Sequence, residues 1–238
     1  MIKLKGFSSY QLHLFAMVFM LIDHIGAVIF PFDFFYRYVG RLSFPIFCYL
    51  LVCGFYKTSN RKKYFLRLFI FAIISEIFFD LVFNSSFIYT NSQNVLWSFC
   101  ISFFMMHIIE KLKYKFIYIV PFIIFIFCFI AYYLKVDYSW YGILIVLLFY
   151  ISYNNKIYFR YILQFVGMII INCVLFKGTL VDYGGIVLYT QPFALLSLFF
   201  IWSFNGKKGY SNVYIKYFNY CFYPLHLFLL YILKYFIA

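Results

Sequence analysis

Side chains that can move a proton lie inside long apolar stretches of this sequence. Asp23 and His24 are adjacent near the N-terminus, and His226 lies near the C-terminus. A histidine beside an acid titrates near neutral pH and suits general acid–base catalysis. The alternative for each histidine is a hydrogen-bonded place in the protein core. We expect His24, and in second place His226, to take part in proton transfer.

Two further pairs of charged residues share a spacing of four. Arg37 and Arg41 form one pair, and Glu76 and Asp80 form the other. Residues four apart project from one face of a helix. A basic face and an acidic face on neighbouring helices would therefore neutralise each other. An ion-pair network that only holds the helices together is the alternative to a role in chemistry.

Asp23 is better placed to pair with an arginine than to orient His24. Adjacent residues on a helix point about 100° apart. An acid that orients a histidine must point at that histidine. We therefore expect Asp23 to contact one of the two arginines.

The composition shows in what environment these residues lie. Of 238 residues, 66% are hydrophobic, 28% aromatic and 11% charged, whereas soluble domains have about 45–50% apolar and about 25% charged residues. A soluble globular protein and a disordered chain are both excluded, and a polytopic membrane protein remains. The net charge of +13 is typical of loops that set orientation and contact anionic lipid, so we expect no nucleic-acid partner.

The apolar stretches predict a helical bundle. A bilayer core needs about 20 apolar residues per helix, and the chain has about nine such stretches. Their connections are short, so we expect one all-α transmembrane domain over residues 1–238. The stretches run roughly over 10–31, 34–56, 64–83, 94–110, 116–134, 139–153, 161–176, 189–203 and 217–237.

Lysine and arginine are concentrated in alternate loops. By the positive-inside rule these loops and the N-terminus are cytoplasmic, which predicts a multi-pass protein of the inner (cytoplasmic) membrane. An odd number of spans places the C-terminus outside. The basic residues are Lys3, Lys5, Lys57, Arg61, Lys62, Lys63, Lys111, Lys113, Lys115, Lys156, Arg160, Lys207, Lys208 and Lys216.

This orientation brings the charged pairs, Asp23 and His24 to one level in the outer half of the membrane. A charge at the bilayer centre costs about 2.5–3.5 kcal/mol, so these groups must face each other or a wet cavity. His226 lies near the middle of the last stretch. Pro224 is expected to interrupt that stretch and to free backbone groups beside a cavity.

Some kinds of site find no support. The sequence contains no H-E-x-x-H, G-x-S-x-G or Walker motif. Its histidines are too scattered to predict a metal site. A cytoplasmic turn, Asn205-Gly206-Lys207-Lys208-Gly209, can capture phosphate through its backbone and lysines, although an ordinary orientation loop is the more common reason for such a turn.

Polar motifs recur in order along nearly the whole chain. They are Leu21–Gly26, Tyr38–Phe47, Ser75-Glu76 with Phe79-Asp80, Gln93–Leu96, Phe204–Gly209 and Phe222–Leu227. This series resembles the TraX family. The chain departs from the family at Cys53, where an acid is frequent, and at Phe78, where proline is frequent.

The resemblance implies an integral membrane acyltransferase. TraX-like proteins acetylate pilin, and they are similar to membrane enzymes that use a cytosolic acyl donor. The implied donor is acetyl-CoA, with no metal. The implied acceptor is an amine or hydroxyl of a pilin, another peptide, an envelope glycan or a lipid, and the sequence does not choose among these.

The expected roles follow from this reaction. His24 or His226 acts as the base or carries the acetyl group, and Arg41 with Arg37 stabilises the oxyanion or holds an anionic acceptor. Asp23 is expected in the catalytic group, holding the arginines. The remaining expected substrate-binding residues are Glu76, Asp80, Tyr223 and Asn94, and the expected cofactor-binding residues are Asn205, Lys207 and Lys208.

Two other classes of protein fit part of the pattern. Buried carboxylates and histidines also form proton relays, as in a proton-coupled small-molecule transporter. The sequence shows no paired halves of the kind that many transporters have. A non-enzymatic assembly protein for pili or the cell envelope is the third possibility, and it would not bind CoA.

Overall fold

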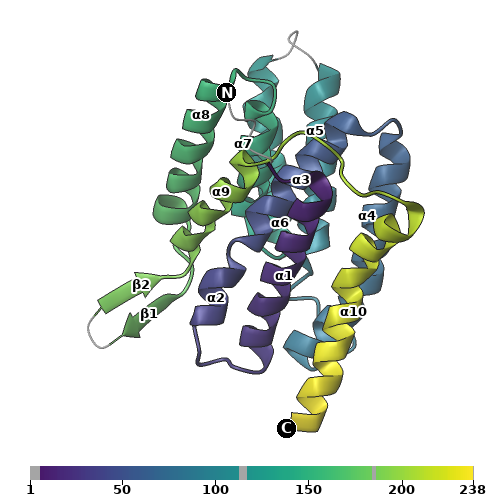
Figure 1. The fold of residues 1–238 in the computed structure, drawn as a ribbon, viewed down its shortest axis with the longest axis vertical. Coiled ribbons are helices and arrows are strands. Elements are labelled where there is room, and N and C mark those ends of the chain that lie inside the picture. The colour runs from purple at the N-terminus through teal and green to yellow at the C-terminus, as the bar shows by residue number, and fades with distance from the viewer. Residues whose placement is uncertain (1–5, 113–116, 184–185, 238) are drawn as a thin grey trace.

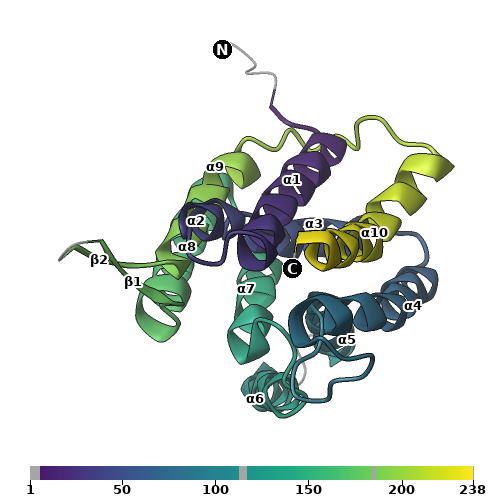
Figure 2. The same cartoon turned by 90° about the horizontal axis from the view of Figure 1, so that it is seen from below.

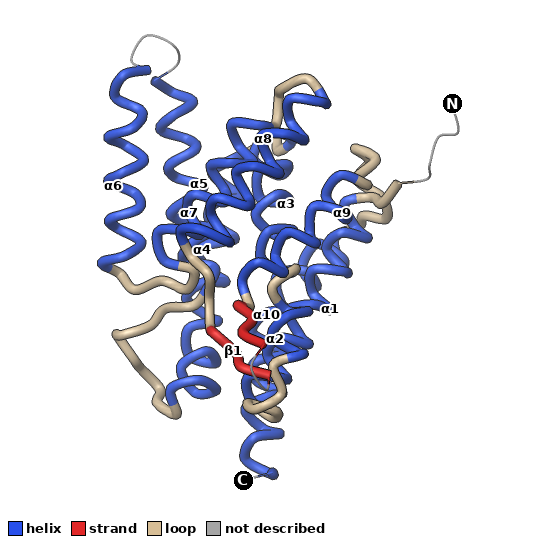
Figure 3. The backbone as a smooth tube through the Cα atoms, turned by 90° about the vertical axis from the view of Figure 1, so that its left-hand side faces the viewer, coloured by secondary structure: helices blue, strands red, loops and turns tan. Residues whose placement is uncertain are grey.

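The computed structural model describes residues 6–112, 117–183 and 186–237. Lys3, Lys5, Lys113 and Lys115, which contributed to the predicted orientation, lie outside these residues. The helices run side by side along the long axis of the molecule (Figure 1). The chain turns back at each end of this bundle, as the tube in Figure 3 shows.

Apart from its turns and loops, the described chain is helical except for one hairpin. Strands β1 and β2 pair antiparallel, with Leu180 opposite Tyr189. The predicted all-α class therefore holds for everything but this small ribbon. The elements are α1 Ser9–Val28, α2 Phe35–Gly40, α3 Ser43–Lys57, α4 Arg61–Phe79, η1 Asp80–Asn84, α5 Val95–Leu112, α6 Val120–Tyr133, α7 Ser139–Ser152, α8 Ile157–Ile169, η3 Ile170–Leu175, β1 Leu180–Tyr183, β2 Ile186–Tyr189, η4 Gln191–Leu196, α9 Ser197–Trp202 and α10 Val213–Ile237.

Local sequence explains where the helices that carry the site begin. Ser8 and Gln11 form a capping box at the start of α1, in which the Ser8 N–H donates to Gln11 Oε1 at 2.9 Å. Asn60 caps α4 by accepting the Lys63 N–H at 2.8 Å. These caps fix the two helix ends that later form the rim of a cavity.

Helix α3 is the centre of the bundle. It packs against α1, α5, α7 and α9, and Figure 2 shows it enclosed by its neighbours when the bundle is viewed from one end. Its side chains Ile46, Cys48, Val52 and Phe55 are almost fully buried. The core thus forms around a helix with an apolar surface on nearly every side.

The outer helices expose apolar side chains instead. Phe122, Phe125 and Phe129 of α6 are exposed, as are Ile162 and Phe165 of α8. A surface of this kind is stable against lipid rather than water. The chain is therefore a helical membrane protein.

Four helical segments of the described chain are long and apolar enough to cross a membrane. They are Ser9–Val28, Phe35–Lys57, Val95–Leu112 and Ile157–Leu175. Shorter apolar helices are Ile117–Tyr133, Ser139–Ser152 and Gln191–Trp202. The count of about nine spans and the cytoplasmic N-terminus stay predictions.

Helix α10 differs from its prediction. It continues through Pro224 from Val213 to Ile237 rather than being interrupted there. Proline has no N–H, so the helix lacks the hydrogen bond that would end on the carbonyl of Tyr220, four residues earlier. Packing along α1 and α4 keeps the helix continuous and directs Tyr223 and His226 inward, where both are buried.

Candidate functional site

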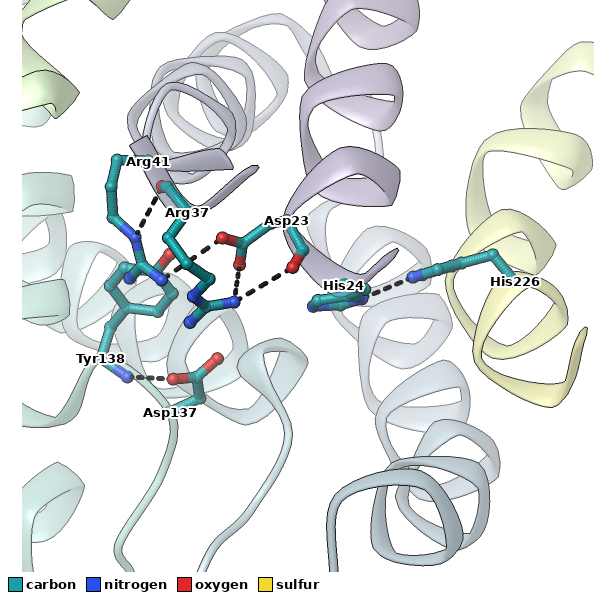
Figure 4. Close-up of polar contacts among 7 residues, drawn as sticks. All are labelled: Asp23, His24, Arg37, Arg41, Asp137, Tyr138 and His226. Carbon is teal, nitrogen blue, oxygen red and sulfur yellow. Dashed lines mark hydrogen bonds and ion pairs between the residues drawn. The ribbon is translucent and has the colours of Figure 1, made fainter. Parts of the chain in front are cut away.

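Asp23 and His24 project from α1 toward different neighbours. Figure 4 shows Asp23 directed at the arginines of the next segment and His24 directed at α10. This is the divergence expected of adjacent helical residues. Helix α1 therefore separates an ion-pair cluster on one side from a histidine pair on the other.

The Asp23 carboxylate binds both arginines, so the expected pairing with an arginine is confirmed. Its Oδ2 is 2.9 Å from Nη1 of Arg37, and its Oδ1 is 3.4 Å from Nη2 of Arg41. Arg37 Nη1 also donates to the Asp23 backbone carbonyl at 3.1 Å. The spacing of four places both guanidinium groups on one face, where a single carboxylate reaches them.

A glycine makes this cluster possible. A Cβ atom added at Gly40 would lie 2.2 Å from Oδ1 of Asp23 and 2.3 Å from its Cβ. Any side chain at position 40 would therefore displace the carboxylate. Gly40 lies between the two arginines and lets α1 approach α2 closely.

Glu76 and Asp80 do not neutralise the arginines, and that part of the expectation was wrong. Glu76 accepts the Trp97 indole N–H at 2.6 Å and also binds the backbone and side chain of Asn94. Asp80 accepts the Tyr89 N–H at 2.8 Å. The acidic pair joins α4 and η1 to the start of α5 and the segment before it, because α4 packs against α5 and α10 rather than against α2.

The two candidate histidines meet although 202 positions separate them. Nδ1 of His24 is 2.7 Å from Nε2 of His226. The rings lie 5.0 Å apart between centroids with 13° between their planes. His226 Nδ1 is 2.8 Å from the Phe222 carbonyl oxygen. The structure thus combines the first and second candidates into one site.

A cavity of about 710 Å³ extends from one end of the bundle to this depth. Asp23, His24, Asp137 and Tyr138 line its deep part. Apolar side chains line the middle, and Tyr223 is also in the wall. Pockets that bind small molecules usually have about 300–1,000 Å³, so this one can hold a substrate or cofactor.

The opening of the cavity is basic. We call this group of side chains the cationic mouth: Lys57, Lys63, Arg67, Lys208 and Lys216. Among the described residues, the acids in the lining are Asp23 and Asp137, both in the deep part. The mouth therefore presents positive charge without a carboxylate of its own.

Lys216 lies at the mouth among other cations. It lies in the first turn of α10, ahead of the expected span. Partial burial, followed by the positive charge of its neighbours, lowers the pKa of Lys216. Those neighbours are Arg67, Lys208 and Lys63. Repulsion of this kind is relieved when an anion binds between the cations.

The remaining predicted site residues divide between the cavity and the scaffold. Lys208 and Tyr223 line the cavity, whereas Lys207, Asn205 and Asn94 are not in its lining. Asn205 instead shapes its own turn by accepting the Lys207 N–H at 2.9 Å. Asn94 is fully buried and donates to the Ala72 carbonyl at 2.8 Å.

Sequence reasoning missed several lining residues. Asp137 lies between two of the expected spans and was not among the predicted site residues. Figure 4 places it beside the arginine cluster, where its Oδ1 accepts the Tyr138 N–H at 2.9 Å. A lone acid in a sparsely charged loop was the available signal. The mouth residue Arg67 lies within the expected span 64–83. A charged residue inside an apolar stretch was the available signal for it.

Asn219 is a further cavity residue that the sequence gave no reason to select. It lines the cavity, and its Oδ1 is buried without a hydrogen-bond partner among the described residues. A buried acceptor without a partner costs about 1–3 kcal/mol. A ligand N–H in the cavity would satisfy it.

Comparison with known proteins now identifies the family. The family model described as TraX protein matches residues 8–234. The chain belongs to the TraX family. The resemblance inferred from the motifs is thereby confirmed. In this TraX family member those motifs contain His24, His226, Asp23, Arg41 and Lys208.

A curated relative matches over nearly the same length. The probable fimbrial assembly protein FimC, serogroup H1, of Dichelobacter nodosus is 29% identical over 243 residues, which cover 94% of each chain. No solved structure matches this TraX family member. The relative is thus a protein named for fimbrial assembly that this chain resembles over nearly its whole length.

Proposed function

We propose that this protein is an inner-membrane acyltransferase that transfers an acetyl group from acetyl-CoA to an amine or hydroxyl of an acceptor. One observation carries the proposal: a single cavity connects the cationic mouth with His24. Phosphate groups and a reactive thioester lie at opposite ends of acetyl-CoA. A cavity with cations at one end and a base at the other matches that arrangement.

The donor's charge supports a cytoplasmic mouth. The nucleotide phosphates of CoA are polyanionic, and a cleft with charge of one sign attracts a ligand of the other sign. In the proposed topology of nine spans with a cytoplasmic N-terminus, the mouth faces the cytosol. The pantetheine arm then extends along the apolar middle of the cavity, past Asn219.

The deep part provides the chemistry. Attack of an amine or hydroxyl on a thioester requires a base that removes the nucleophile's proton. His24 lines this part of the cavity and is the proposed base. The arginines are bound to Asp23, so we propose that they hold the Asp23 carboxylate and balance its charge.

The acceptor is proposed from the relative. Its name as a fimbrial assembly protein favours a pilin or fimbrial subunit over a glycan or a lipid. The same name is compatible with a second function, non-enzymatic assistance in pilus assembly. The two functions differ in whether acetyl-CoA binds and reacts.

The experiment measures binding and transfer separately. In detergent, acetyl-CoA at 100 times its Kd should stabilise the purified protein by about 2.7 kcal/mol. In proteoliposomes, radiolabelled acetyl groups should move to an added pilin, and His24→Ala should abolish this. A protein that neither binds acetyl-CoA nor transfers acetyl groups would be an assembly protein instead.

A further inference from the structure

We propose that His226 holds His24 in the tautomer whose Nε2 carries no proton, which makes Nε2 the atom that accepts the proton during transfer. The inference builds on the proposed acyl transfer and gives His226 a separate task. His226 is then a positioning residue, and His24 is the catalytic one. The argument depends on where each imidazole proton must lie.

The proton of His226 is located by its backbone partner. Nδ1 of His226 is 2.8 Å from the carbonyl oxygen of Phe222. A carbonyl oxygen only accepts hydrogen bonds. Nδ1 of His226 therefore carries the proton and donates it to Phe222. In the neutral ring Nε2 then has a free lone pair and acts only as an acceptor.

The proton of His24 follows from this. Nδ1 of His24 is 2.7 Å from Nε2 of His226, and one of these two nitrogens must donate. Since Nε2 of His226 accepts, Nδ1 of His24 carries the proton. Nε2 of His24 is then the unprotonated nitrogen, and none of the described residues is hydrogen-bonded to it.

Packing holds both rings in this arrangement. The Phe222 ring stacks on His226 with centroids 5.0 Å apart and 21° between planes. Phe83 meets His24 edge-on at 5.4 Å. His226 is 4% exposed and is not in the cavity lining, whereas His24 is. Only His24 can meet a substrate, and His226 acts through it.

The arrangement also stabilises the charged state that forms during transfer. When His24 accepts a proton at Nε2, its Nδ1–H still donates to Nε2 of His226. The donor is now an imidazolium, and a hydrogen bond from a charged donor is roughly twice as strong as a neutral one. The pair therefore favours the transition state over the resting state.

The balanced step uses only the donor and the acceptor. The acceptor nitrogen or oxygen attacks the thioester carbonyl carbon while its proton moves to Nε2 of His24. The new C–N or C–O bond forms, the C–S bond breaks, and the thiolate leaves. The thiolate takes the proton from Nε2 of His24, which yields CoA thiol and returns His24 to its starting tautomer.

Two variants of His226 separate positioning from packing. In His226→Gln, the side-chain oxygen can still accept from Nδ1 of His24. In His226→Phe, the ring volume stays but the acceptor is lost. We expect His226→Gln to keep kcat within about tenfold and His226→Phe to lower kcat about 100-fold or more. The Kd for acetyl-CoA should not change in either, and His107→Gln is the control that should leave kcat unchanged.

The tautomer itself is read by ¹⁵N NMR of histidine-labelled protein in nanodiscs, because protonated and unprotonated ring nitrogens have well-separated shifts. His24→Gln and His226→Gln assign the signals. We expect wild-type His24 to carry its proton on Nδ1 and none on Nε2. In His226→Phe we expect the proton on Nε2, or a mixture of the two tautomers. A proton on Nε2 of wild-type His24, or unchanged kcat in His226→Phe, overturns it.

The two levels of the proposal fail in different ways. If the wild-type protein transfers no acetyl group, the proposed function is overturned, and the base role of His24 with it. The NMR measurement still decides the proton positions in that case. If transfer occurs but the tautomer is the opposite one, acyl transfer stands and the positioning role of His226 is overturned.

Discussion

Oδ2 of Asp23 lies 2.9 Å from Nη1 of Arg37, and the two side chains are 11% and 31% exposed. Asp23 thus compensates an arginine that lipid or an apolar core would not tolerate alone. The same carboxylate also binds Arg41, whose side chain is 12% exposed. One carboxylate therefore forms ion pairs with two cations on the next segment.

Replacing Asp23 should lower the free energy of unfolding more than replacing an exposed acid does. Asp23→Asn leaves Arg37 and Arg41 without their negative partner, and breaking a buried ion pair in this way costs about 3–5 kcal/mol. The free energy of unfolding by SDS in mixed micelles measures the loss. Asp33→Asn, an exposed acid whose side chain accepts the Phe35 N–H, is the control, since the asparagine side-chain oxygen can accept the same hydrogen bond. Equal losses in both variants would contradict the role of Asp23.

Gly40→Ala should disturb the same cluster without changing any charge. The new Cβ would lie 2.2 Å from Oδ1 of Asp23, so the carboxylate or the helix must move. Overpacking of this kind costs about 1–3 kcal/mol. We expect a lower midpoint of thermal unfolding and slower acetyl transfer. Gly206→Asn is the control, because open space surrounds Gly206 and its φ of +79° is one that asparagine tolerates. A Gly40→Ala protein as stable as the wild type would show that the close approach is unimportant.

Charge at the mouth should govern donor affinity. Lys63→Gln combined with Lys216→Gln removes two cations from the mouth, and we expect the Kd for acetyl-CoA to rise about tenfold, which is about 1.4 kcal/mol. The Kd should also depend less on salt, because exposed charges are screened over about 8 Å at physiological ionic strength. Isothermal titration calorimetry in detergent at two salt concentrations measures both effects. Lys62→Gln is the matched control, since Lys62 is exposed outside the cavity lining. An unchanged Kd in the double variant would place the donor elsewhere.

Glu76 should matter for stability and not for donor binding. Its carboxylate accepts from Asn94 and from the Trp97 indole N–H. In Glu76→Gln an amide N–H₂ replaces one of the accepting oxygens, and a donor left without its partner costs about 1–3 kcal/mol. We expect the free energy of unfolding by SDS to fall by that amount, while the Kd for acetyl-CoA stays unchanged. Glu110→Gln removes the partly exposed pair with Arg61 and should cost only about 0–1 kcal/mol. A Kd that rises with Glu76→Gln would return Glu76 to the substrate site.

The sequence alone determined the class of the protein and indicated most of the candidate site residues. Apolar stretches of about 20 residues with few charges predict membrane helices, because a helix satisfies its backbone hydrogen bonds within its own segment. The motifs determined the family. The divergence of Asp23 and His24 was also predictable, since it follows from the geometry of one helix.

Partners between helices were decided only by the tertiary structure. A spacing of four showed that Glu76 and Asp80 share a face, but not what that face meets. It meets the start of α5 and the segment before it. The contact between His24 and His226 joins α1 to α10 across 202 positions. Helix periodicity is local, whereas the side chain that lies opposite depends on how helices pack. The cationic mouth has the same origin, because the ends of α3, α4 and α10 and the loop after α9 converge only in the folded bundle.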